Sequence, residues 1–132
     1  MNATAHVHSP GFLKIVEDAR SRVKEFGIDE FLERLAAGER FVLLDVREDN
    51  EWAQGHLPSA HHMGRGVIER DIEEALPEKD TPLVLYCRGG FRSALAADHL
   101  QQMGYTNVTS LDGGWRGWTG RGLPTVIPDA GA

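Results

Sequence analysis

Apolar residues near the start of the chain recur at alternating steps of four and three positions, which is the spacing of one face of an amphipathic helix. The residues of this stripe are Phe12, Val16, Ala19, Val23 and Phe26. The pattern predicts a helix from Gly11 to Phe26 that ends at Gly27. A second, short helix should follow, with Asp29 as its N-cap and its end near Ala37, before Gly38.

Short apolar runs after this point have the length and the β-branched residues of strands buried in a parallel sheet. The clear ones are Phe41 to Val46, Pro82 to Tyr86 and Val108 to Leu111, and a weaker strand is expected from Ala60 to Met63. Helical segments are predicted between and after them, at Asn50 to Gln54, Val67 to Leu76, Ser93 to Met103 and within Gly113 to Gly122. Strands that alternate with helices predict an α/β fold with a mainly parallel sheet and helices on both faces.

The chain of 132 residues has the length of one compact domain. Its net charge of −6 argues against a nucleic-acid surface, which needs clustered Lys and Arg in excess. No apolar run approaches the length of a membrane helix, and the first residues lack the pattern of a secretory signal. We therefore expect a cytoplasmic monomer that is not bound to membranes and whose partners are small molecules or other proteins.

Cys87 is the only cysteine of the chain, so it cannot form an intramolecular disulfide or a multi-cysteine metal site. It stands where a buried strand meets Gly89 and Gly90, at the carboxyl end of the strand, where α/β folds bind ligands. Consecutive glycines let backbone N–H groups turn inward toward an anion, and the following helix adds its positive end. With Arg88 and Arg92 beside it, the thiolate of Cys87 should be stabilised.

Two other interpretations of this segment remain open on these residues alone. Cys87 can be an inert buried residue beside a tight turn. A cysteine-dependent phosphatase or arsenate reductase is the other alternative, but such phosphatases use a Cys-x5-Arg loop that surrounds phosphate. Here Arg92 makes the spacing Cys-x4-Arg, and Ser93 stands one step later. The shorter loop favours a smaller ligand centred on sulfur.

Three segments in order resemble the rhodanese family of sulfurtransferases. Leu43 to Ala60 resembles its upstream signature, in which an acidic-basic pair precedes a Gly-His-aliphatic-Pro turn. Val84 to Ser93 resembles its six-residue active loop, and Leu111 to Pro124 resembles its downstream Gly-Gly-x-x-x-Trp and Gly-x-Pro signature. The likeness covers 41–124, so we expect a tail and an amphipathic helix at 1–27, a rhodanese-like domain at 28–126 and a C-terminal tail at 127–132.

The resemblance implies a parallel sheet of about five strands and a double displacement through a persulfide on Cys87, with no metal or organic cofactor. The amides of the loop Arg88, Gly89, Gly90, Phe91 and Arg92 would hold the sulfur. The donor would be a small anion such as thiosulfate. The acceptor would be external, namely cyanide, a thiol or a protein, because no second cysteine can resolve the persulfide. A sulfur carrier that both loads from and delivers to proteins is the alternative.

Asp45 and Arg47 end the first core strand and, by the resemblance, lie near the active loop, where they would brace it rather than bind substrate. A cysteine-hydrolase triad of Cys87, Asp45 and His56 is the less favoured reading. The pairs His61-His62 and His6-x-His8 are expected to be surface residues rather than metal ligands. Trp115 and Trp118 should pack the last short helix onto the domain. The first helix either covers the domain, which is favoured, or offers a partner surface.

Overall fold

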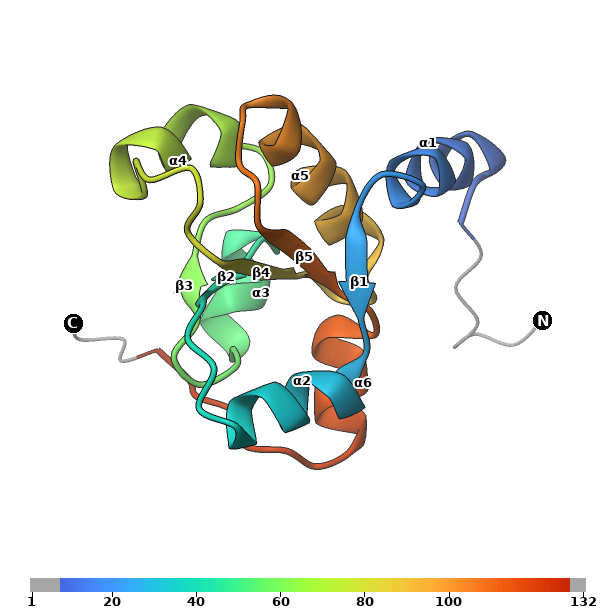
Figure 1. Ribbon diagram of the computed structural model, residues 1–132. Helices are drawn as coiled ribbons and strands as arrows, with labels where there is room; N and C mark the ends of the chain where they lie inside the picture. The colour runs from blue at the N-terminus through green and yellow to red at the C-terminus, as the bar shows by residue number, and fades with distance from the viewer. Residues whose placement is uncertain (1–7, 129–132) are drawn as a thin grey trace.

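The computed structural model describes residues 8–128, in which five parallel strands form one sheet in the order β1-β5-β4-β2-β3. The strands are β1 (Lys24–Phe26), β2 (Val42–Asp45), β3 (His61–His62), β4 (Leu83–Tyr86) and β5 (Val108–Leu111). The helices are α1 (Pro10–Arg20), α2 (Ile28–Ala36), α3 (Asp49–Gln54), α4 (Ile68–Ala75), α5 (Phe91–Gln102) and α6 (Gly114–Gly120). Figure 1 shows α1, α4 and α5 on one side of the sheet and α2, α3 and α6 on the other. The predicted α/β class, parallel sheet and helices on both faces are confirmed.

The prediction of one long helix from Gly11 to Phe26 is wrong, because its last part is a strand. Helix α1 ends at Arg20, where the side chain of Ser21 donates a hydrogen bond to the Asp18 carbonyl. The next residues turn back and β1 pairs with β5, with Phe26 opposite Leu111. Gly27 is consequently the N-cap of α2 rather than the end of a helix. Pairing with a strand more than eighty residues away outweighs the local helical spacing.

The sheet separates two hydrophobic cores, and β4 contributes to both because its side chains alternate. Leu83, Leu85 and the following Cys87 face the core that is shared with α4 and α5. Val84 and Tyr86 face the core on the other side, which contains residues of α2 and α6. The side chain of Cys87 therefore belongs to the α5 side of the sheet.

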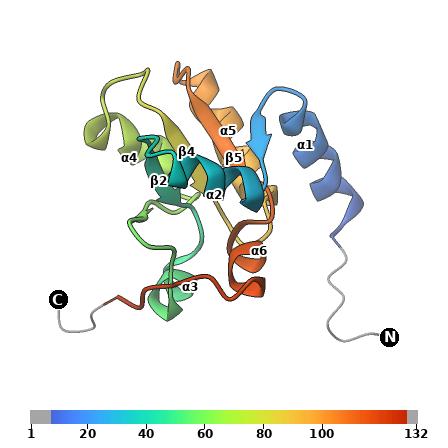
Figure 2. The same cartoon turned by 60° about the horizontal axis from the view of Figure 1, so that its bottom comes forward.

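Both ends of the described chain pack onto the domain. Helix α1 lies along α5, and Val16 and Ala19 are buried against Leu95. The apolar stripe of α1 thus covers the domain, which is the favoured alternative. After α6 the chain runs back to α3, as Figure 2 shows, and Val126 forms an antiparallel bridge with His56. No helix within residues 8–128 is long and apolar enough to cross a membrane.

Candidate active site

Cys87 lies directly after β4, and the loop that follows it leads into α5. The residue is 1% exposed. The backbone N–H of Gly90 donates a hydrogen bond of 3.1 Å to its sulfur, and Ser93 Oγ lies 3.5 Å from the same atom. The thiol donates to Ser93 Oγ and accepts from the Gly90 N–H. A backbone N–H donor stabilises a sulfur anion more than a neutral thiol, and the N-terminus of α5 adds to its effect. The sulfur of Cys87 therefore lies within reach of a backbone N–H at the start of α5.

A second buried hydroxyl, that of Ser110, forms a hydrogen bond with the hydroxyl of Ser93. Ser93 Oγ lies 2.7 Å from Ser110 Oγ on β5, and both residues are fully buried. If Ser110 donates to Ser93, the hydrogen of Ser93 is free to point at the sulfur of Cys87. Ser110 was not predicted, because a serine within a strand gives no local signal that it will face a loop distant in sequence.

The first turn of α6 is bonded to the backbone of the active loop. The N–H of Trp115 donates to the Cys87 carbonyl and the N–H of Arg116 to the Arg88 carbonyl, each at 2.9 Å. This approach requires glycine at position 114, where φ is +46° and a Cβ atom would collide with the Cys87 carbonyl oxygen. The downstream Gly-Gly-Trp segment therefore fixes the loop that carries the cysteine.

The two arginines of the loop differ in their surroundings. Arg92 forms an ion pair of 3.1 Å with Glu51 of α3, and Glu48 lies 3.9 Å away. Burial acts to raise the pKa of Glu51, but hydrogen bonds from Arg92 and from the Glu48 N–H outweigh it and leave this pKa below its ordinary value. Arg88 is exposed, and no carboxylate within residues 8–128 pairs with it. The role of both side chains in donor capture stays a prediction.

Asp45 and Arg47 form a buried ion pair below the loop. Arg47 Nη2 donates to Asp45 Oδ2 at 2.7 Å and to the Gly55 carbonyl at 2.6 Å. The guanidinium also lies 4.4 Å from the ring centre of Trp115, whose backbone N–H bonds the active loop. Burial, together with the charge of Asp45, raises the pKa of Tyr86. These contacts favour bracing as the role of the pair.

His56 and Trp118 make packing contacts and hydrogen bonds away from the thiol of Cys87. His56 Nδ1 lies 2.8 Å from the Leu57 carbonyl oxygen, and its ring stacks on Trp52 at 3.7 Å, so it forms no triad with Cys87 in the described chain. Within residues 8–128 no group of three or more His, Cys, Asp or Glu residues could hold a metal ion. His6 lies outside the described residues. Trp118 is buried and donates to the Pro124 carbonyl, as expected for a packing residue.

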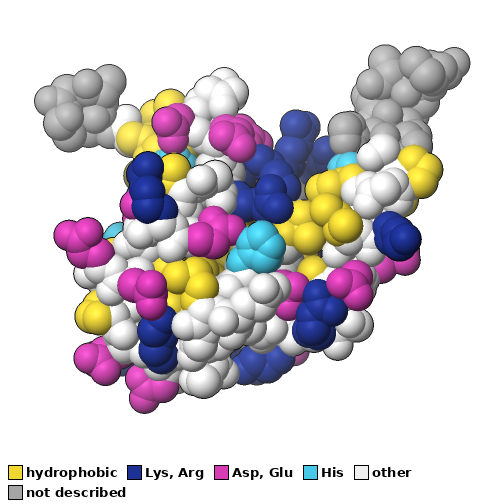
Figure 3. Space-filling view, turned by 90° about the horizontal axis from the view of Figure 1, so that it is seen from above, with side chains coloured by type: hydrophobic (Ala, Val, Ile, Leu, Met, Phe, Trp, Pro, Cys, Tyr) yellow, Lys and Arg dark blue, Asp and Glu magenta, His cyan; other side chains and the backbone are white. Residues whose placement is uncertain are grey.

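The far side of the loop is covered by α1. Phe91 makes an edge contact with the ring of His8 at 4.3 Å, and the guanidinium of Arg20 lies 4.7 Å above the Phe91 ring. Figure 3 looks onto the α1, α4 and α5 side and shows several Lys and Arg side chains gathered next to an apolar patch. An acidic chain thus presents a basic region here.

A cavity of about 330 Å³ adjoins the loop on the other side, between α3 and α6. Its lining is formed by Arg47, Glu51, Gln54, Arg88, Trp115, Arg116 and Thr119. The sequence pattern does not indicate Glu51 or Arg116 as site residues, because each becomes part of the site only when its helix lies beside the loop. The site is therefore a buried thiol that accepts a backbone N–H bond from Gly90, on a loop with arginine side chains beside it.

Comparison with known proteins shows the family to which the chain belongs. The sequence profile of the rhodanese-like domain matches residues 28–121. A sulfurtransferase of Allochromatium vinosum is 39% identical over 81% of this chain and 98% of its own length. The thiosulfate sulfurtransferase GlpE of Pseudoalteromonas translucida is 33% identical over 72% of this chain and 88% of its own.

Among solved structures, a protein of unknown function from Rhodopseudomonas palustris, described as a possible tyrosine phosphatase, superposes with a TM-score of 0.80 at 27% identity. The match covers 94% of this chain and all of that one. The family match and the sulfurtransferase relatives together settle the relationship. The chain belongs to the family of rhodanese-like domains, and its curated relatives include sulfurtransferases.

Proposed function

We propose that this protein is a sulfurtransferase that moves sulfane sulfur from a small anionic donor such as thiosulfate to a thiophilic acceptor through a persulfide on Cys87. The observation that carries the proposal is the single cysteine whose sulfur accepts a backbone N–H bond from Gly90 at the N-terminus of α5. The relative named thiosulfate sulfurtransferase supports thiosulfate as donor. No metal or organic cofactor takes part in these steps.

The first half-reaction loads the cysteine. The Cys87 thiolate attacks the outer sulfur of thiosulfate, a new S–S bond forms, and sulfite leaves with the electron pair of the old S–S bond. The loop amides and the N-terminus of α5 hold the negative charge during the exchange. The persulfide keeps that charge on its outer sulfur, where the same donors can reach it.

The second half-reaction returns the cysteine to its starting state. The persulfide first takes up a proton from water. A thiolate acceptor then attacks its outer sulfur, the bond from that sulfur to Cys87 Sγ breaks, and Cys87 leaves as a thiolate. The acceptor carries away the sulfur and its proton. Because the chain has no other cysteine, the acceptor must come from outside.

The ion pair of Arg92 with Glu51 argues against phosphatase chemistry. In a phosphatase the loop arginine holds two phosphate oxygens, but here Arg92 is engaged by Glu51 of α3. The loop is also one residue shorter than the phosphatase pattern. Sulfur transfer needs only a cradle for one sulfur atom and its charge, which this loop offers.

The test is an intact-mass measurement before and after thiosulfate and again after cyanide, with Cys87→Ser as control. We expect a gain of about 32 Da that cyanide removes and that the variant lacks, as required for a covalent sulfur intermediate. No gain with thiosulfate or with inorganic polysulfide would refute the proposal. Loading by polysulfide alone would exclude thiosulfate as donor, and hydrolysis of an aryl phosphate that depends on Cys87 would support the phosphatase alternative.

A further inference from the structure

We infer that this protein has a second binding site, on the α2 and α6 side of the sheet, for a small apolar molecule that carries a carboxylate. The site is a cavity of about 610 Å³ between α2, the start of β2, α6, the turn at 57–59 and residues 123–124, which we call the apolar cavity. It contains no residue of the loop 87–92. The inference therefore goes beyond the proposed sulfur transfer and does not depend on it.

The floor of the apolar cavity is made of core side chains. The ring of Phe31 on α2 lies 5.7 Å from the ring of Phe41 and 5.8 Å from that of Trp118 on α6, measured between ring centres. Leu43 of β2 and Leu57 belong to the same hydrophobic cluster and are buried. Because the packing of the domain fixes these side chains, the floor is formed before any ligand binds.

The apolar wall continues from this floor to the surface along α2. Phe31 and Leu35 lie one turn apart on the same face of the helix, but Phe31 is 1% exposed and Leu35 is 43% exposed. Leu32 and Leu123, which also line the cavity, are partly buried. An apolar group that enters from solvent therefore covers side chains that water contacts in the free protein, which favours binding.

The size and the lining of the apolar cavity are typical of a site for a small organic molecule. Such sites have volumes of about 300–1,000 Å³ and combine an apolar lining with a few polar groups that orient the ligand. The polar side chains in this lining are those of Glu39, Arg40 and Ser59. The polar part of the ligand should therefore match the charge that these side chains leave free.

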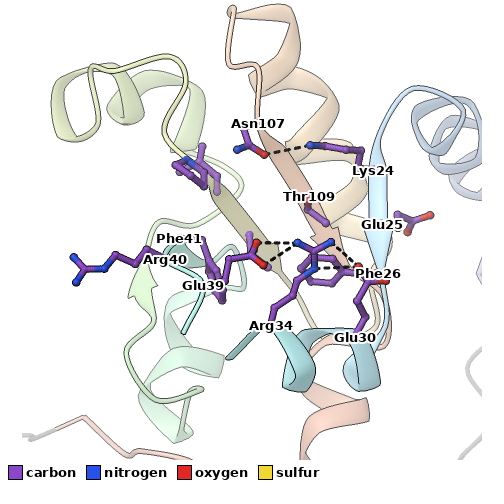
Figure 4. Close-up of a pocket in the computed structure, with 13 residues that line it drawn as sticks. Lys24, Glu25, Phe26, Glu30, Arg34, Glu39, Arg40, Phe41, Asn107 and Thr109 are labelled. Atoms are coloured by element: carbon purple, nitrogen blue, oxygen red, sulfur yellow. Dashed lines mark hydrogen bonds and ion pairs between the residues drawn. The ribbon is translucent and has the colours of Figure 1, made fainter. Parts of the chain in front are cut away.

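Of the two charged side chains, only that of Arg40 is available to a ligand. Glu39 accepts a hydrogen bond of 2.8 Å from Arg34, which also pairs with Glu30 at 2.7 Å. Figure 4 shows a neighbouring cavity, with the guanidinium of Arg34 between these two carboxylates and the side chain of Arg40 directed away from them. Arg40 is exposed and pairs with no carboxylate within residues 8–128. Its planar group is suited to a carboxylate, which it can bind through two N–H donors.

The two features together select the class of ligand. A neutral hydrocarbon or alcohol would cover the floor but would leave Arg40 without a partner. A bare inorganic anion would pair with Arg40 but would leave the apolar wall exposed to water. A small aliphatic or aromatic carboxylate uses both, so it should bind better than either.

The experiment titrates the complete chain with octanoate, octanol and octylammonium, which share one apolar chain and differ in the charge of the head group. Isothermal titration calorimetry at low salt, below the concentrations at which these compounds aggregate, gives each Kd. The indole N–H of Trp118 donates to the Pro124 carbonyl inside the lining, so its NMR signal reports on occupation of the cavity. The indole signal of Trp52, which lies outside the lining, is the internal control.

Two variants test the two features, each with a matched control on the other side of the sheet. Arg40→Gln removes the unpaired charge, and Arg70→Gln removes the charge of an exposed arginine on α4. Leu35→Asp places a carboxylate on the apolar wall, and Ile15→Asp makes the same change at a leucine-sized residue of α1 that is 51% exposed. All four positions are at the surface, so circular dichroism should show the wild-type fold.

We expect octanoate to bind more tightly than octanol, and octylammonium to bind least. Arg40→Gln should weaken octanoate binding about 3- to 5-fold, as for loss of one exposed ion pair, and change octanol binding less than about 1.5-fold. Leu35→Asp should weaken both ligands about 5-fold or more, because the new carboxylate is costly to cover. High salt should reduce the advantage of octanoate over octanol. The control variants should bind like the wild type, and only the Trp118 signal should shift.

No binding of octanoate, or binding that Arg40→Gln and Leu35→Asp leave unchanged, would overturn the site. Equal weakening by the control variants would show adsorption to the surface at large and would also overturn it. Octanol binding as tight as octanoate binding at low salt would overturn the assignment of a carboxylate ligand. Uptake of sulfur by Cys87 is a separate measurement, so its failure would affect the proposed function and not this site.

Discussion

The buried ion pair below the active loop allows a strong prediction about stability. The side chains of Asp45 and Arg47 are 0% and 3% exposed. Asp45→Asn leaves the guanidinium of Arg47 in the interior without a carboxylate, with the Gly55 carbonyl, a neutral amide and the ring of Trp115 as its remaining neighbours. Removal of one partner of such a pair costs about 3–5 kcal/mol of unfolding free energy. In a domain of this size that loss lowers Tm by roughly 10–20 °C.

Urea unfolding followed by tryptophan fluorescence measures this loss, because Trp115 lies against Arg47. Glu30→Gln is the control, since it breaks an exposed ion pair with Arg34 and should leave the free energy of unfolding almost unchanged. The double variant Asp45→Leu with Arg47→Met removes both charges and should recover most of the stability. A loss below about 1 kcal/mol for Asp45→Asn would refute the reasoning that the pair is an isolated buried charge pair.

Three further predictions concern the active loop. Ser110→Ala should slow alkylation of Cys87 by iodoacetamide about 3- to 10-fold at neutral pH, because Ser93 loses the partner that directs its hydroxyl. An unchanged rate would contradict the influence of Ser110 on Cys87 through Ser93. Gly114→Ala should lower the free energy of unfolding in urea by at least about 1–2 kcal/mol, because of the positive φ and the collision of the new Cβ with the Cys87 carbonyl oxygen. Equal stability of the variant and the wild type would show that α6 can move away from the loop. Because the pKa of Glu51 is lowered in the fold, its stabilising effect is present above its unfolded pKa and is lost as pH falls through the folded value. The stability difference between wild type and Glu51→Gln should therefore shrink as pH falls below the ordinary glutamate pKa of about 4.3 and vanish below the lowered folded pKa, and a constant difference would contradict the ion pair with Arg92.

The elements that the sequence predicts well are those whose signal is local. The apolar run Phe41 to Val46 contains β2, and the range expected for the last strand, Val108 to Leu111, is that of β5. Helix α3 ends at Gln54 as predicted, and the cysteine predicted at the end of a buried strand lies directly after β4. These segments carry their structural preference in adjacent residues.

The features that the sequence does not predict depend on contacts between distant segments. Residues 24–26 are a strand only because β5 lies beside them, and nothing near them competes with the helical spacing. The site shows the same limit. The active loop could be predicted, but Ser110, Arg116 and Glu51 reach it from a strand and two helices whose placement is set by the whole sheet.

The edge strand β1 has a further consequence for how the protein can be handled. It lies before the residues that the family profile matches, yet it hydrogen-bonds along the otherwise open side of β5. A fragment that begins at residue 28 lacks β1, so β5 becomes an edge strand whose outward N–H and C=O groups are unpaired. Exposed edge strands pair with strands of other molecules, so such a fragment should self-associate even though it retains the complete cysteine loop.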